Sequence, residues 1–221
     1  MPGEAHLELL EPAQNLAVDT DEVLEHIRLA CNPDEEELSN NLEGYIKSAT
    51  QTIENITGKV LIKQKWRQTE DHTYSYGSID EKFDRIKYGR DTRRQRNNFI
   101  RLMKRPVLDI TEIRYIDDNH EEKVWNSDNY VLAGHRLRAK ELFPQHREFA
   151  SFIIEFEAGY GEDAADVPLQ LQQAVKKLTA TMYEDRRYFE QLQLKDESIT
   201  LQDLPAHIRA DVSHYITRGG W

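Results

Sequence analysis

Cationic side chains that could bind phosphate or carboxylate groups are concentrated between positions 82 and 105. This segment holds ten lysines and arginines against two aspartates, so its formal charge is +8. Phe83, Tyr88 and Phe99 are interleaved with the cations. Such a segment suits contact with a phosphate backbone or with a strongly acidic protein surface. The cations that we take as candidate contact residues are Lys82, Arg85, Lys87, Arg90, Arg93, Arg94 and Arg96.

The rest of the chain bears the opposite charge. The whole sequence of 221 residues has a formal net charge of −11, so the part outside 82–105 carries −19. That acidic part would repel DNA, whereas it would attract the basic segment of its own chain or of a neighbouring copy. A solvated or subunit-contacting loop is therefore favoured over DNA contact, and both alternatives stay open.

Residue patterns for metal binding are missing from the sequence. The histidines form neither an HExxH motif nor a comparable ligand spacing. Cys31 is the only cysteine, which excludes a thiolate cluster and an intrachain disulfide. We expect no metal and no cofactor, and we interpret the eight histidines as surface or interface residues: His6, His26, His72, His120, His135, His146, His207 and His214.

Patterns for catalysis or nucleotide binding are missing as well. Gly159 and Gly161 follow a strand but do not form a GxGxxG motif, and there is no P-loop and no GxSxG motif. The acidic pair Asp117/Asp118 fits a turn better than a divalent-ion site. An enzyme with an unrecognised acidic metal site is the weakest alternative, and we expect no catalytic residue.

The chain has the length of one domain, or of one domain with an elaborated insertion. No window approaches the roughly 18 apolar residues that a membrane span needs. The first residues lack the basic start and apolar run of a signal peptide. We therefore expect no membrane association.

Two helical patterns enclose a β-rich middle. Asn32-Pro33 begins a stripe at helical spacing that ends at Gly58, and a second stripe spans 167–189. The stretches between them have the alternation and turn residues of strands. The order of helices, strands and helices predicts an α+β fold: a helical bundle from the N- and C-terminal helices with an inserted small, mostly antiparallel β-subdomain. The predicted parts are an N-terminal arm with connector helices (1–58), a β-insertion (59–161) with a long basic loop (67–98), a long bundle helix (162–190) and a C-terminal partner-docking tail (191–221).

Four blocks follow one another in a fixed order. They are a short capped helix at 16–29, a helix at 42–58 that leads to Trp66, the run Arg105-Pro106-Val107 with a strand at 110–117, and 151–187. The last block is a strand, two glycines, an acidic loop and a helix that begins at Val167-Pro168. This succession resembles the head–tail connector (adaptor, or head-completion) proteins of tailed bacteriophages, in the branch with a β-insertion between connector helices. The resemblance covers roughly 7–66 and 99–189, and the segment 67–98 is longer and more basic than the family pattern.

The resemblance implies a structural virion protein and no enzyme. Family members form a ring, typically of twelve subunits, beneath the portal protein, extend the DNA channel and offer a docking platform to the next neck or tail-completion protein. The packaged DNA passes through this channel, and the protein would lie at the head–tail junction of the virion after assembly in the host cytoplasm. The alternative is a DNA-binding head-completion factor that acts through 82–105.

The C-terminal stretch is the candidate docking segment for the portal or another partner. A polar linker precedes a short helical pattern, which predicts that 199–221 is mobile in the monomer and orders on a partner. The candidate docking residues are Leu204, Ile208, Val212, Tyr215, Ile216 and Trp221.

Overall fold

The computed structural model describes residues 6–30, 35–70, 99–140, 143–144, 146, 150–185, 190 and 199–216. Helices and antiparallel strand pairs make it a mixed α+β protein, which confirms the fold class at this level. The chain forms two compact units. One is a β unit of Met1–Leu10, Lys65–Met103 and Asp109–Glu157, and the other is a helical unit of Glu11–Gln64, Lys104–Leu108 and Ala158–Trp221.

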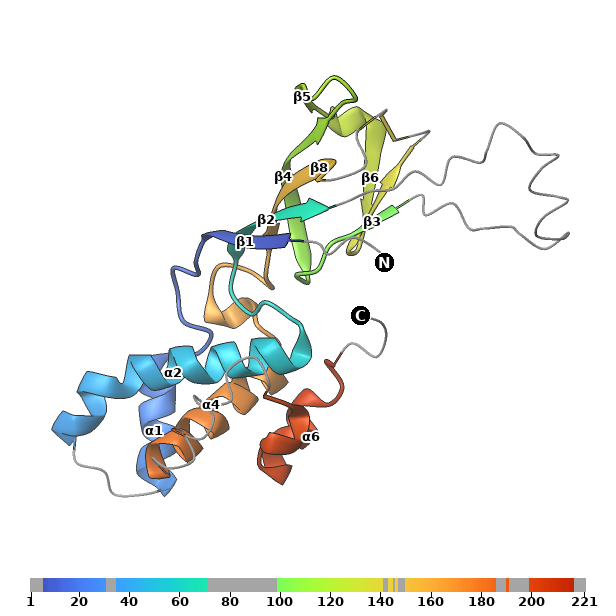
Figure 1. Ribbon diagram of the computed structural model, residues 1–221. Coiled ribbons are helices and arrows are strands. Elements are labelled where there is room, and N and C mark those ends of the chain that lie inside the picture. The colour runs from blue at the N-terminus through green and yellow to red at the C-terminus, as the bar shows by residue number, and fades with distance from the viewer. Residues whose placement is uncertain are drawn as a thin grey trace, which may run out of the picture. The chain divides into compact units, whose positions relative to one another are not determined.

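The helical unit is organised around one helix, α4 (Leu169–Glu184), which contacts α1 (Thr20–Ala30), α2 (Glu35–Thr57) and α6 (Ala206–Val212) (Figure 1). A short 3-10 turn, η2 (Ala164–Asp166), precedes α4, and another, η4 (Leu201–Asp203), precedes α6. The helical stripes that the sequence predicts meet in one apolar core. Its members on the helices include Val23, Ile27, Ile46, Ala49, Ile53, Leu171, Val175, Leu178, Met182, Ile208 and Val212.

Glycine ends α2 where the sequence predicts it. Gly58 has φ 65°, a left-handed conformation that costs glycine little, and its N–H donates to the carbonyl of Glu54 over 2.8 Å. The chain then turns into an extended segment, in which Val60, Leu61 and Ile62 are buried.

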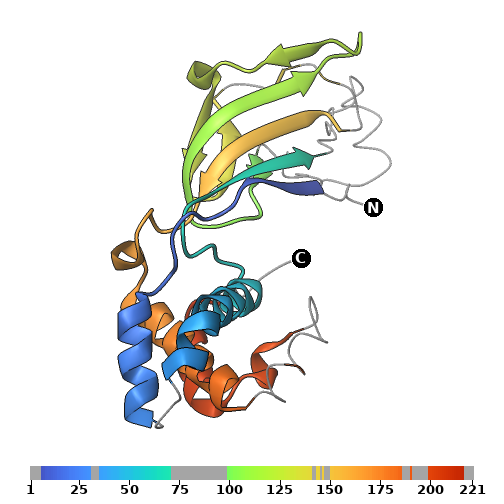
Figure 2. The ribbon, with the colours of Figure 1, turned by 90° about the vertical axis from the view of Figure 1, so that its left-hand side faces the viewer.

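The β unit contains two sheets. The five-stranded sheet, which faces the viewer in Figure 2, has the order β1-β2-β8-β4-β5. The three-stranded sheet has the order β3-β7-β6. The pairs β4–β5, β3–β7 and β6–β7 are antiparallel. The strands are β1 (His6–Glu11), β2 (Gln64–Glu70), β3 (Phe99–Arg101), β4 (Val107–Ile116), β5 (Glu122–Val124), β6 (Tyr130–Ala133), β7 (Arg136–Ala139) and β8 (Phe152–Ala158), with a 3-10 turn, η1 (Ser127–Asn129), before β6.

The core of the β unit is aromatic at its centre. Phe152, Ile154 and Phe156 are buried at alternate positions of β8, as the period-2 pattern predicts. The ring of Trp125 lies 5.2 Å from that of Phe143 and 5.7 Å from that of Phe152, measured between centroids. The smaller sheet contributes buried residues of β3 and β7, such as Ile100 and Leu137.

Candidate functional site

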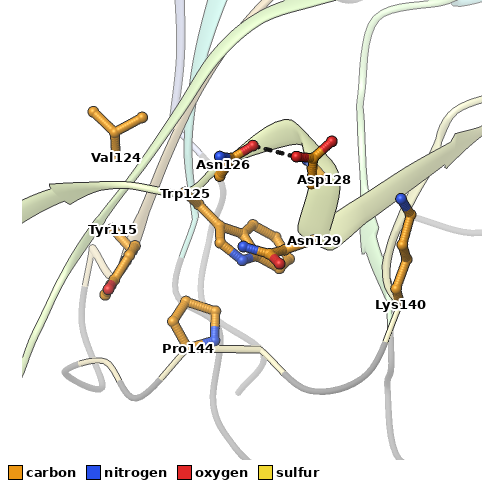
Figure 3. Close-up of a pocket in the computed structure, with 8 residues that line it drawn as sticks. All are labelled: Tyr115, Val124, Trp125, Asn126, Asp128, Asn129, Lys140 and Pro144. Carbon is orange, nitrogen blue, oxygen red and sulfur yellow. Dashed lines mark hydrogen bonds between the residues drawn. The ribbon is translucent and has the colours of Figure 1, made fainter.

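A hollow of about 440 Å³ opens beside the aromatic core of the β unit (Figure 3). Its walls come from the end of β4, from β5 and the turn after it, and from the segment after β7. The lining residues are Tyr115, Val124, Trp125, Asn126, Asp128, Asn129, Lys140 and Pro144.

One wall of this hollow is a turn that a local hydrogen bond holds in place. The side-chain oxygen of Asn126 accepts the N–H of Asp128 over 2.9 Å and so begins η1. Among the lining residues that the structure describes there is no histidine, serine or cysteine, and the charged side chains are those of Asp128 and Lys140. The arrangement can bind a polar or apolar group, but it lacks a nucleophile paired with a base.

A second hollow, of about 390 Å³, lies at the start of α1 in the helical unit. Its polar groups are engaged with one another. The Asn15 amide donates to the carbonyl of Glu162 over 3.1 Å and to the carboxylate of Asp163 over 3.2 Å, and the carboxylate of Asp19 accepts the N–H of Asp21 over 2.8 Å. This hollow therefore joins the chain before α1 to the loop before α4.

Within the part of the chain that the structure describes, no cluster of three or more histidine, cysteine or acidic residues could hold a metal ion. Asp117 instead organises a turn. Its carboxylate accepts the N–H groups of Asn119 and Glu121, each over 2.9 Å, and pairs with Lys123. The hydrogen bond from Lys123, aided by these N–H groups, lowers the pKa of Asp117.

A helix with the length and apolar character of a membrane span is not found among the described residues.

The two glycines after β8 serve close backbone packing. Gly159 has φ 145°, and a Cβ built on it would lie 2.6 Å from the backbone nitrogen of Lys63. The N–H of Gly159 donates to the carbonyl of Pro106 over 2.9 Å, and the carbonyl of Gly161 accepts the N–H of Lys63 over 2.7 Å. These groups face the chain itself, so the geometry fits a structural turn and not a phosphate loop.

A carboxyl group that sequence reasoning missed lies where α2 gives way to the extended segment. Glu54 accepts the N–H of Leu61 over 2.6 Å. Burial raises the pKa of Glu54 to about 7, against the opposing effects of Leu61, Lys104 and Gln64. Burial also lowers the pKa of Lys104, against the attraction of Glu54. No local sequence signal separates Glu54 from Glu43, an exposed acid of the same helix, because the groups around Glu54 include Lys104, which is distant in the chain.

An ion-pair network crosses the five-stranded sheet. Glu155 on β8 contacts Arg67 on β2 over 2.9 Å, Arg114 on β4 over 3.0 Å and Lys65 over 3.8 Å. Burial acts to raise the pKa of Glu155, but these three cations hold it below its ordinary value. The network connects strands that are distant in sequence, so it stabilises the order of the sheet.

The sequence-predicted contact residues are only partly placed. Lys82, Arg85, Lys87, Arg90, Arg93, Arg94 and Arg96 lie outside the described residues. The described cations of the basic segment belong to different units. Arg101 lies on β3 in the β unit, whereas Lys104 and Arg105 belong to the helical unit.

The candidate docking tail divides in the same way. Leu204, Ile208 and Val212 are buried in the core of the helical unit, and Tyr215 and Ile216 are half-buried. Trp221 lies outside the described residues. The apolar stripe of α6 therefore has a partner within its own chain, which the sequence pattern of this short helix did not reveal.

No protein-family model matches the sequence, and no curated protein matches it. Solved structures with a similar fold do exist. A chain in the neck of an empty gene transfer agent (GTA) particle, computed with C6 symmetry, has a TM-score of 0.67 and 20% identity over 98% of this chain and 97% of that one. A chain in the virion of the native GTA particle has a TM-score of 0.66 and 21% identity over 97% of both chains. A chain in the neck of the native GTA particle, computed with C12 symmetry, has a TM-score of 0.65 and 21% identity over 98% of this chain and 97% of that one. The similarity in fold to these chains of GTA particles therefore extends over both units of this chain.

Proposed function

We propose that this chain is a structural protein of a virion neck, a head–tail connector without enzymatic activity. One observation carries the proposal: the fold matches chains of GTA necks over nearly the full length of both partners. The ordered sequence blocks that resemble tailed-phage connectors support the same assignment independently of the fold, in the branch with a β-insertion between connector helices.

The proposed organisation is a ring beneath the portal protein. In this proposal the helical unit supplies the bundle. The β unit corresponds to most of the predicted insertion (59–161), joined by β1 from the predicted N-terminal arm (1–58), whereas Lys104–Leu108 belongs to the helical unit. The C12 symmetry of a similar neck supports a dodecamer. A cyclic ring needs two different, complementary patches on each subunit, and the +8 segment and the −19 remainder of the chain offer such a pair. The ring would extend the DNA channel at the head–tail junction after assembly in the host cytoplasm.

In this proposal the C-terminal tail docks on the portal or on the next neck or tail-completion protein. Ile216 and Trp221 are its proposed contact residues, because the buried Leu204, Ile208 and Val212 would have to leave the core first. Tyr215 is half-buried, so the accessible part of its side chain can also contact the partner.

Electron microscopy of the protein mixed with the portal protein from the same gene cluster tests the assignment. We expect a second ring stacked coaxially on the portal ring. An Ile216→Ser/Trp221→Ser variant should lose stacking, whereas Val131→Ser, an exposed change in the β unit, should retain it. Portal rings that stay bare at micromolar wild-type protein would overturn the proposal.

A DNA-binding head-completion factor that acts through 82–105 is the second candidate, favoured by the density of cations in that segment. Neutralising Arg93, Arg94 and Arg96 tests it. Portal stacking with no DNA binding at low salt would reject this candidate and leave the connector assignment intact.

A further inference from the structure

Three exposed arginines lie on one face of the three-stranded sheet, and an exposed lysine follows its central strand. β7 is the central strand, and its exposed residues Arg136 and Arg138 alternate with buried ones. Lys140 comes directly after the end of β7 and is also exposed, and it lines the hollow that Asp128 also lines. Arg101 of β3 joins this face because it is paired directly with Arg136 across the ladder. We call Arg101, Arg136, Arg138 and Lys140 the basic sheet face.

No acidic residue balances this charge on the three strands. The other outward positions are Phe99, which is paired with Arg138, and Val131 and Ala133 of β6. Within the described part of the chain, Arg136, Arg138 and Lys140 have no carboxylate at ion-pair distance. Arg101 and Arg136 lie directly opposite each other, which places two positive charges on neighbouring strands.

An aromatic ring holds one of these cations in place. The guanidinium carbon of Arg136 lies 5.1 Å from the ring centroid of Phe99, on the neighbouring strand. Such a contact orders the side chain while the N–H groups at the edge of the guanidinium can still donate to an oxygen. The face therefore presents ordered donors and positive charge together.

We propose that the basic sheet face binds the phosphate backbone of duplex DNA. Alternate residues of a strand are about 6.8 Å apart, so Arg136 and Arg138 begin a row of cations that Lys140 follows, and DNA presents a continuous row of anions. Arginine matches phosphate oxygens with paired donors. The centre of a protein–protein interface is usually poor in charge, which argues against an acidic protein as the occupant. Contacts of this kind are independent of base sequence.

The proposal adds a DNA contact that the neck assignment does not supply, and it does not depend on ring formation. The cation-rich residues 82–96 lie outside the described part of the chain, so the proposal rests on the described residues of β3 and β7 and on Lys140 alone. The neck assignment can fail while DNA binding persists, and the reverse also holds.

Fluorescence anisotropy with a labelled 30-base-pair duplex of mixed sequence tests the proposal in the full-length protein. The binding constant is measured between about 25 and 200 mM salt. We expect Arg101→Gln/Arg136→Gln/Arg138→Gln to weaken binding at least about tenfold at the lowest salt and to reduce the slope of log K against log salt by about three. A charge-matched control in the helical unit, Lys47→Gln/Lys63→Gln/Arg209→Gln, should retain most of both quantities. Replacing the three arginines by lysine should restore most of the slope, because the charge is kept.

Three outcomes overturn the proposal. The first is that the wild-type protein fails to bind the duplex at low salt. The second is that the two triple-Gln variants lose binding to the same extent. The third is that the sheet variant binds as tightly as the wild type, which would assign DNA binding to residues 82–96. If the wild-type protein fails to bind the duplex and the sheet variant alters self-association in sedimentation, the face meets an acidic protein surface instead. Equal circular dichroism spectra and melting temperatures show that the variants are folded.

Discussion

The ammonium group of Lys176 on α4 forms an ion pair with the carboxylate of Glu22 on α1. The two side chains differ in environment, since that of Lys176 is 10% exposed and that of Glu22 is 57% exposed. A nearly buried cation is thus held by an acid that faces solvent. This contact links the first helix to the central helix of the helical unit, next to the apolar residues Val23 and Val175.

Removing the acid from this pair should destabilise the protein. Glu22→Gln removes the negative charge that offsets the lost hydration of the Lys176 ammonium group. Because water reaches part of the site, we expect a loss of about 1–2 kcal/mol in the free energy of unfolding. Glu25→Gln, on the exposed side of the same helix, should have no measurable effect. Urea unfolding measures the free energy of unfolding of both variants and of the wild type. Adding Lys176→Met to Glu22→Gln should recover most of the loss, and equal stabilities of the two single variants would contradict the argument.

Gly159 should tolerate no side chain. Its φ of 145° is unfavourable for other residues, and a Cβ would lie 2.6 Å from the backbone nitrogen of Lys63. We expect Gly159→Ala to cost about 3 kcal/mol or more in the free energy of unfolding. Gly44→Ala is the matched control, since a Cβ there meets nothing within 4 Å and α2 should gain up to about 1 kcal/mol. A neutral Gly159→Ala variant would show that the backbone can move apart there.

Periodicity explains which parts of the fold could be predicted from the sequence. The stripes of α2 and α4 and the alternation of β8 follow from the 3.6- and 2-residue periods, and Gly58 ends α2 for a local reason. The opposition of Arg101 and Arg136 could not be predicted, because strand pairing brings together residues that no local pattern connects. The pocket between Tyr115 and Lys140 depends on the same long-range packing. The polar linker before α6 favours docking on a partner, but the short apolar stripe of α6 has the same pattern whether it packs on its own chain or on another.

Glu54 should make stability dependent on pH. Its folded-state pKa of about 7 lies above the ordinary value of 4.5, so the folded protein binds a proton that the unfolded chain releases. Stability contributed by this proton is present below about pH 4.5 and is lost as the pH rises to about 7, by at most about 3 kcal/mol. The side chain retains some exposure, which makes this an upper bound.

The Glu54→Gln variant tests this origin. Gln keeps an acceptor for the Leu61 N–H without the charge, so the difference in stability between variant and wild type should shift in favour of the variant between pH 5 and pH 8. Glu43→Gln, at an exposed position of the same helix, should follow the wild-type pH profile. Parallel profiles for Glu54→Gln and the wild type would show that another group carries the pH dependence.

Hydrogen exchange should distinguish an α6 packed on its own chain from one that orders only on a partner. The burial of Leu204, Ile208 and Val212, and the hydrogen bond from the Arg209 N–H to the Pro205 carbonyl over 3.0 Å, predict slow exchange for 206–212 in the isolated protein. Ile208→Ala removes roughly 2–4 kcal/mol of packing and should accelerate this exchange, whereas His207→Ala, at an exposed position, should not. Exchange of 206–212 at the rate of an unstructured peptide in the wild-type protein would instead favour the expectation from sequence, in which this segment orders on a partner. In that case the portal, when added, should supply the protection that the isolated chain lacks.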